Sequence, residues 1–154
     1  MNAKDVLNLL KSPVFADLCK QHGVSLAVLF GSQATGRATE ASDVDLAVLM
    51  RDKSRPDDLL SLARERREFM RELISYIKST DVDLIILNHA NPLLKFQVAR
   101  TGKPVYQETP GLFSSFCSLA VRQHEDSMVF YRATDRYLRQ AAERRRRDGR
   151  HSCD

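Results

Sequence analysis

The chain has 154 residues, of which 43% are hydrophobic and 29% are charged. This composition is typical of one globular domain and excludes a disordered chain. No apolar run approaches the roughly 20 residues that a membrane span needs, and the first residues lack a signal-peptide pattern, so we expect a cytoplasmic protein without membrane contact. Three cysteines without zinc-ligand spacing are expected to be free thiols.

The net charge of +4 comes entirely from the C-terminal end of the chain. The segment 132–154 carries eight arginines and four acidic residues, whereas residues 1–131 carry 16 basic and 16 acidic residues. Such a basic tail could contact RNA, a phosphate-rich ligand or an acidic protein. We favour the plainer interpretation that it is a solvated helix end, where cationic side chains are stabilised by the helix dipole.

The hydrophobic pattern predicts helices that alternate with short strands. Two helix starts are predicted by an N-cap residue followed by proline in the first helical position, at Ser12-Pro13 and at Asn91-Pro92. Pro104 predicts an edge strand, because proline cannot donate to a central ladder. The predicted helices are 5–10, 13–21, 56–79, 92–100 and 112–147, and the predicted strands are 24–30, 44–50, 82–87 and 103–107.

This alternation predicts an α/β (α+β) domain with a small mixed sheet flanked by helices and a long C-terminal helix. We expect residues 1–110 to form the main domain. Residues 111–154 are expected to form a helix with a basic tail, which either packs on the same domain or serves as a partner-binding arm. An apolar stripe on this helix is interpreted as core: Phe116, Leu119, Ala120 and Met128.

The segment 30–45, FGSQATGRATEASDVD, connects two buried strands and holds the informative residues. A glycine at the end of a strand, here Gly31, lets backbone N–H groups approach a phosphate closely, and Ser32 adds a hydroxyl. A short helix starting at this turn would also favour an anion. Arg37 could contact a triphosphate or the acceptor, or be an ordinary exposed arginine.

Asp43 and Asp45 are separated by one residue at the start of a strand, so their carboxylates are predicted to share one face. Val44 then points into the core on the other face. Paired carboxylates repel unless a cation lies between them, and Mg²⁺ is the cation that prefers such oxygen ligands. If the strand 82–87 lies beside 44–50, Asp83 joins the same cluster. Three carboxylates beside a Gly-Ser turn indicate phosphoryl or nucleotidyl transfer.

These residues resemble a known family. The ordered set of Gly31-Ser32, ten intervening residues, Asp43-x-Asp45 and a third aspartate in an apolar strand is similar to the nucleotidyltransferase fold shared with DNA polymerase beta. The chain most resembles the minimal single-domain members, the MntA-like antitoxins of HEPN–MNT toxin–antitoxin modules, over about residues 24–107.

The resemblance implies a set of roles. Gly31 and Ser32 would hold nucleotide phosphates, and Arg37 is a further candidate for nucleotide binding. Asp43 and Asp45 would bind one or two Mg²⁺, and Asp83 would complete the metal set and act as, or position, the base. ATP would be the donor of AMP, and the acceptor would be a tyrosine hydroxyl of a cognate HEPN RNase toxin, which the modification silences.

Three alternatives stay open, because a fold alone does not identify the acceptor. The acceptor could be a small molecule, such as an aminoglycoside, or an RNA end. The basic tail would suit an RNA, although we do not favour nucleic-acid contact. Alternatively, the protein could neutralise a toxin mainly by binding it, with catalysis secondary.

Overall fold

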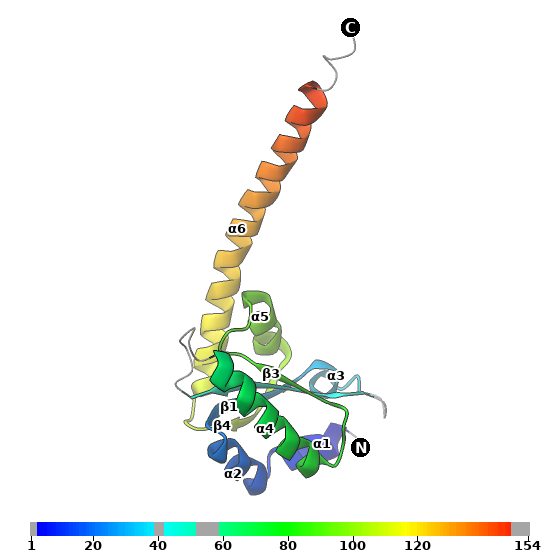
Figure 1. The fold of residues 1–154 in the computed structure, drawn as a ribbon, viewed down its shortest axis with the longest axis vertical. Helices are drawn as coiled ribbons and strands as arrows, with labels where there is room; N and C mark the ends of the chain where they lie inside the picture. Colours follow the sequence, from blue (N-terminus) through cyan, green and yellow to red (C-terminus); the bar gives the residue numbers. More distant parts are fainter. Residues whose placement is uncertain (1–2, 39–41, 52–58, 149–154) are drawn as a thin grey trace.

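The predicted alternation of helices and strands is present in the computed structural model, which describes residues 3–38, 42–51 and 59–148, without side chains at 3, 59 and 142–148 (Figure 1). The N-cap predictions are confirmed. Ser12 Oγ accepts from the backbone N–H of Phe15 at 3.2 Å, and Asn91 Oδ1 accepts from that of Leu94 at 2.8 Å. The elements are α1 (Ala3–Leu10), α2 (Pro13–Gln21), β1 (Val24–Phe30), α3 (Gly31–Thr35), β2 (Val44–Met50), α4 (Leu59–Ile77), β3 (Val82–Ile86), α5 (Pro92–Thr101), β4 (Lys103–Gln107) and α6 (Leu112–Asp148).

The four strands form one mixed sheet in the order β3-β2-β1-β4. β1 is antiparallel to both of its neighbours, whereas β2 and β3 are parallel and are connected through α4. β4, which contains Pro104, is an edge strand as predicted. The small mixed sheet flanked by helices is therefore confirmed.

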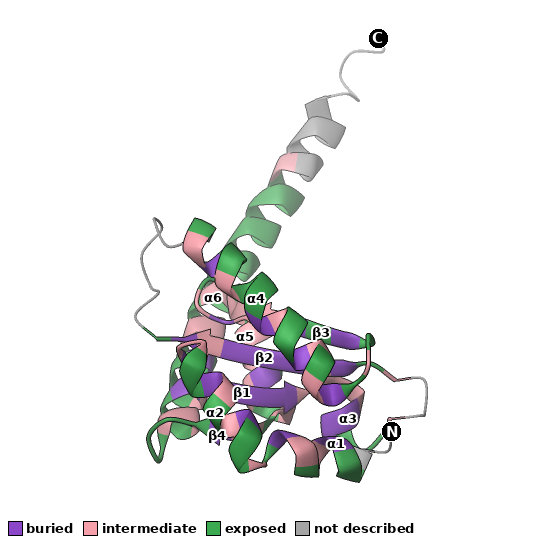
Figure 2. Cartoon of the chain, turned by 60° about the horizontal axis from the view of Figure 1, so that its bottom comes forward, coloured by how far each residue is buried: buried purple, intermediate pink, exposed green. Residues whose placement is uncertain are grey.

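Helices cover the two faces of the sheet unequally (Figure 2). On one face, α1, α2 and α4 bury the larger hydrophobic cluster, which includes Val44, Leu46 and Phe69. On the other face, α5 and α6 cover a smaller cluster that includes Ala47 and Phe116. Alternate residues of β2 belong to different clusters, because successive side chains in a strand point to opposite faces.

The boundaries of α4 differ from the prediction of 56–79. Residues 56–58 lie outside the described part of the chain. At the C-terminal end the helix stops at Ile77, because Lys78 adopts a left-handed backbone conformation with φ 58°. The charged middle of the helix is exposed as expected, while Phe69 on the opposite side is fully buried.

The long C-terminal helix, α6, has two different halves. Near its start, Phe116 and Ala120 are buried against α5 and the sheet. Farther along, the helix extends away from the body (Figure 1). The prediction that Leu119 and Met128 belong to the core is wrong, since 46% and 36% of these residues are exposed. None of the described helices combines the length and the apolar content required to cross a membrane.

Candidate functional site

Two predicted site aspartates lie side by side on neighbouring strands. Asp45 of β2 pairs in register with Asp83 of β3. Because the strands are parallel and in register, both side chains leave the same face of the sheet. The neighbouring Val44 is buried on the opposite face, as predicted, and holds the strand in this register. Asp43 immediately precedes β2 and is exposed.

The Gly-Ser turn contacts the same carboxylate. Phe30, the last residue of β1, pairs with Asp45 across the antiparallel ladder, and Gly31 follows it with φ +68°. A Cβ atom at Gly31 would overlap Oδ2 of Asp45. Only glycine combines the positive φ with this close approach. The structure therefore brings together Gly31, Asp45 and Asp83, with Ser32 half-buried in the first turn of α3.

Asp83 and Asp43 act electrostatically on the carboxylate of Asp45. The pKa of Asp45 is raised above its ordinary value of 3.8, first by partial burial and then by the negative charges of Asp83 and Asp43. Each of these effects disfavours the ionised form. A cation at this position would relieve the repulsion, and a set of carboxylate oxygens suits Mg²⁺. Within the described residues, however, no three His, Cys, Asp or Glu side chains form a ready-made metal centre.

Arg37 is less closely tied to the site. Its backbone N–H donates to the carbonyl oxygen of Ser32 at 3.1 Å, just after Gly36 ends α3 in a left-handed conformation with φ 75°. The Arg37 side chain is exposed. The structure thus places its backbone beside the Gly-Ser turn and leaves its guanidinium in solvent.

Sequence reasoning missed Gln33, which links the turn to the aspartates. Its side chain is 4% exposed, and Nε2 donates to the carbonyl oxygen of Ser42 at 3.2 Å. Ser42 directly precedes Asp43, so this bond fixes the approach to β2 from α3. The other amide atom, Oε1, is buried without a hydrogen-bond partner among the described residues. The sequence gives no signal for such a residue, because its partner is a backbone carbonyl, which every residue type offers.

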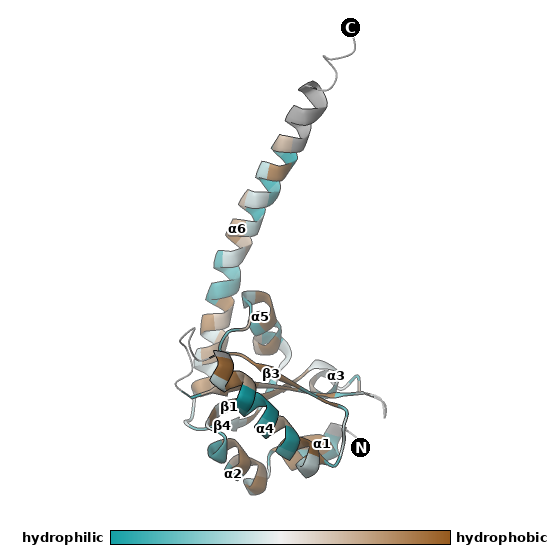
Figure 3. Cartoon of the chain, in the orientation of Figure 1, coloured by the Kyte–Doolittle hydropathy of each residue, from teal (hydrophilic) through white to brown (hydrophobic). Residues whose placement is uncertain are grey.

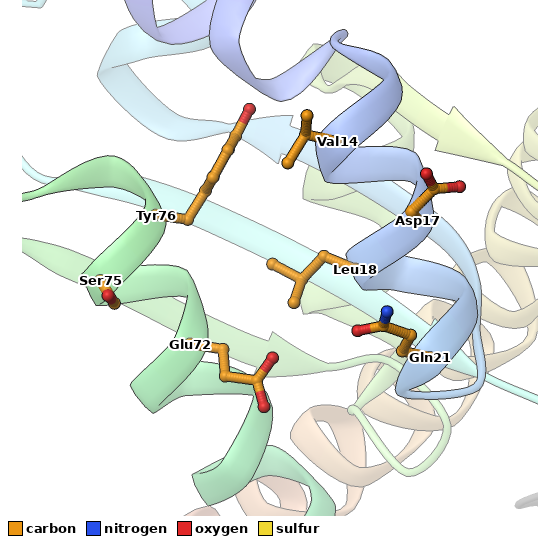
Figure 4. Close-up of a pocket in the computed structure, with 7 residues that line it drawn as sticks. All are labelled: Val14, Asp17, Leu18, Gln21, Glu72, Ser75 and Tyr76. Carbon is orange, nitrogen blue, oxygen red and sulfur yellow. The ribbon is translucent and has the colours of Figure 1, made fainter.

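A cavity of about 430 Å³ lies elsewhere, between α2 and α4 (Figure 4). Leu18 of α2 lies opposite Glu72 and Tyr76 of α4 across this cavity. Tyr76 donates its hydroxyl to the carbonyl oxygen of Leu9 at 2.9 Å, which is a structural role. Because these helices cover the sheet face opposite Asp45, the cavity is separate from the carboxylate cluster.

Comparison with known proteins agrees with this arrangement. The family model described as polymerase beta, nucleotidyltransferase, matches residues 15–110. A protein adenylyltransferase MntA from Aphanizomenon flos-aquae is 35% identical over 96 residues, which is 60% of this chain and 63% of that protein. The match thus spans less than two thirds of the Aphanizomenon protein. A putative protein adenylyltransferase from Methanocaldococcus jannaschii is 32% identical over 60% of this chain and 89% of its own length.

Two solved structures with the same fold come from toxin–antitoxin complexes. A chain from a toxin–antitoxin crystal structure with AMP-PNP superposes with a TM-score of 0.64 at 26% identity, covering 80% of this chain and 94% of that one. A chain from the complex MntA–HepT gives a TM-score of 0.60 at 25% identity, covering 85% and 97%. The family match, the two relatives and the shared fold lead to one conclusion: this chain belongs to the polymerase beta nucleotidyltransferase family.

Proposed function

We propose that the protein is a Mg²⁺-dependent adenylyltransferase that acts as an antitoxin, transferring AMP from ATP to a tyrosine hydroxyl of a partner HEPN-type toxin. The observation that carries the proposal is the in-register pair Asp45–Asp83, with Gly31 packed against the Asp45 carboxylate. The names of the two relatives support protein adenylylation, and the toxin–antitoxin neighbours support a protein acceptor.

Each site residue has a role in this proposal. Asp43, Asp45 and Asp83 would hold the metal, because a cation would offset the negative charges of Asp83 and Asp43 that act on Asp45. Bound there, Mg²⁺ would neutralise negative charge on the phosphate oxygens. The backbone at Gly31 and the hydroxyl of Ser32 would bind the phosphates of ATP. The exposed Arg37 side chain is free to reach toward the nucleotide from the end of α3.

The reaction is an in-line displacement at the α-phosphorus of ATP. The acceptor oxygen forms a bond to phosphorus, and the bond from phosphorus to the bridging oxygen of the leaving group breaks, which releases pyrophosphate. The acceptor hydroxyl loses its proton to Asp83 or to a base that Asp83 orients. Asp83 suits this role because its side chain is exposed beside Asp45.

The test is transfer of label from ATP labelled at the α-phosphate, with Mg²⁺, into a lysate of the source cell. We expect one protein to be labelled by wild type, with no label from γ-labelled ATP and none with the Asp43→Asn variant. Mass spectrometry of the labelled protein should locate AMP on a tyrosine.

Other outcomes separate the alternatives. Label on RNA or on a small molecule would replace the protein acceptor by one of these classes. Binding to an RNA through the basic tail would also weaken steeply with salt. If the Asp43→Asn variant still neutralises the toxin fully, binding rather than catalysis is the antitoxin mechanism.

A further inference from the structure

We infer that the distal arm, residues 122–141 of α6, is a docking surface for a helix of a partner protein. The inference rests on the proposed function insofar as the partner is the protein that accepts AMP. The carboxylate site does not determine where the acceptor protein binds, and the arm would provide that binding surface. The arm extends beyond the body of the molecule (Figure 1), and most of its residues are exposed.

The apolar face of the arm continues the face that packs against α5. Leu138 follows Ala120 by 18 positions, or about five helical turns, and Phe130 follows Phe116 by 14 positions, or nearly four. Both exposed residues therefore lie on the side of α6 that is buried nearer the body. Hydrophobic segments recur along the arm (Figure 3). A stripe that is buried at one end and continues uncovered at the other indicates a missing partner.

The exposed area is large for a helix without a partner. Phe130, Tyr131 and Tyr137 are 69%, 61% and 70% exposed, and Leu138 is 59% exposed. Three aromatic side chains at this exposure present on the order of 400 Å². The largest apolar patch on a typical soluble monomer is about this size, and such a patch is often functional. It also supplies about half of one partner's share of a standard protein–protein interface.

The composition of the arm favours protein over nucleic acid. Tyrosine, phenylalanine, methionine and arginine are enriched in protein interfaces and lysine is depleted, and the arm has no lysine. A nucleic-acid site would interleave cations with the aromatic rings. Here the four arginines of the arm lie about 100° to 160° from Ala120 around the helix axis, off the apolar stripe: Arg122, Arg132, Arg136 and Arg139.

The neighbouring geometry indicates that the occupant is a helix. Nearer the body, α5 packs along the stripe, and Phe96 of α5 stacks on His124 with ring centroids 4.0 Å apart. Where α5 begins, a cavity of about 260 Å³ opens between Leu93 and the arm residues Met128 and Tyr131. A partner helix placed in line with α5 would fill this cavity and cover the remaining stripe.

The test uses the full chain with a photo-crosslinking benzoylphenylalanine at position 130 or 138, expressed in the source cell. The matched control has the same residue at position 129, because Val129 is 68% exposed but lies two and a half turns from Ala120, on the opposite side. We expect positions 130 and 138, and not 129, to crosslink to the protein that accepts AMP. Adducts with RNA or with a second copy of this chain, equal adducts from 129, or no adduct would overturn the inference.

A kinetic experiment separates docking from catalysis. The double variant Phe130→Glu/Leu138→Glu should raise KM for the purified acceptor at least tenfold and leave ATP binding unchanged, while Val129→Glu should change neither. If the double variant labels the acceptor as well as wild type does, the docking surface is wrong and the proposed function stands. If wild type labels no protein, the proposed function fails. Crosslinks from positions 130 and 138, but not from 129, to one and the same other protein would then still support the docking surface, and their absence would overturn it.

Discussion

The two faces of the sheet are built from the same strands but differ in chemical character: one is apolar throughout, and the other carries carboxylates at one end. On the face under α1, α2 and α4, the side chains of β2 are Val44, Leu46 and Val48, all buried in one continuous core. On the other face, the same strand presents Asp45, then Ala47 under α5 and α6. On the face under α1, α2 and α4, β2 is therefore buried from its first residue. On the face under α5 and α6, β2 begins with the charged side chain of Asp45.

This difference shows how a small domain accommodates three carboxylates close together. Burial and the neighbouring charges raise the pKa of Asp45, so the cluster is electrostatically unfavourable without a cation. The fully apolar face stabilises the fold without taking part in the chemistry. Changes on the two faces should consequently have separable effects on activity and on stability.

The largest expected effect is on the charged face. Asp43→Asn or Asp45→Asn should reduce adenylyl transfer by at least about a thousandfold, or about 4 kcal/mol in activation free energy. The reason is that each change removes one negative ligand for the metal and its bound phosphates. Transfer is measured with α-labelled ATP, and circular dichroism checks that the fold is retained. Full activity of both variants would refute the assignment of the site.

On the apolar face, Phe69→Ala should lower the free energy of unfolding by about 3–5 kcal/mol, because it leaves a cavity under α4. Phe69 is fully buried and its ring lies 5.3 Å from that of His22. The quantity is measured by urea denaturation. The control on the same helix, Arg67→Ala, changes an exposed residue and should alter stability by less than about 0.5 kcal/mol. A fall in activity per folded molecule would contradict the separation of the two faces.

A substitution at Gln33 tests whether the contact between α3 and the residues before Asp43 affects the rate of adenylyl transfer. Gln33→Met keeps the side-chain volume and removes the hydrogen bond to Ser42, so we expect kcat/KM to fall about tenfold, or about 1.4 kcal/mol. The loss of one buried hydrogen bond should cost about 1 kcal/mol of stability. Arg67→Ala, an exposed change on α4 away from the site, is the control. If the two variants have equal kinetics, Gln33 has no positioning role.

The smallest effect concerns the pH dependence of stability. The pKa of Asp45 is raised in the folded state, so its contribution to stability is fully present below the unfolded pKa and is lost as pH rises through the folded value. Without Mg²⁺, Asp45→Asn should therefore raise Tm slightly at pH 7, and this advantage should vanish as the pH falls below about 4. Asp126→Asn, which removes an exposed carboxylate from α6, is the control. An advantage that grows as the pH falls would contradict the proposed repulsion.

Much of the fold could be predicted from local signals. The caps at Ser12 and Asn91 mark helix starts because a side-chain oxygen there satisfies a free backbone N–H. The short apolar runs 24–30 and 44–50 are strands, as their composition indicates. The candidate site residues Gly31, Asp43 and Asp45 could be proposed from the sequence for the same reason, since their types and spacing reflect backbone geometry within one connected segment.

Other features depend on contacts between elements that are far apart in the chain. That Asp83 stands beside Asp45 depends on the parallel pairing of β3 with β2, which no local pattern specifies. The point at which α6 leaves the body, between Ala120 and Met128, also depends on distant segments. Sequence spacing determines which side chains share a face, because helix and strand periods are fixed by the backbone. Which faces meet another element, and which remain uncovered, is determined by packing between elements that are far apart in the chain.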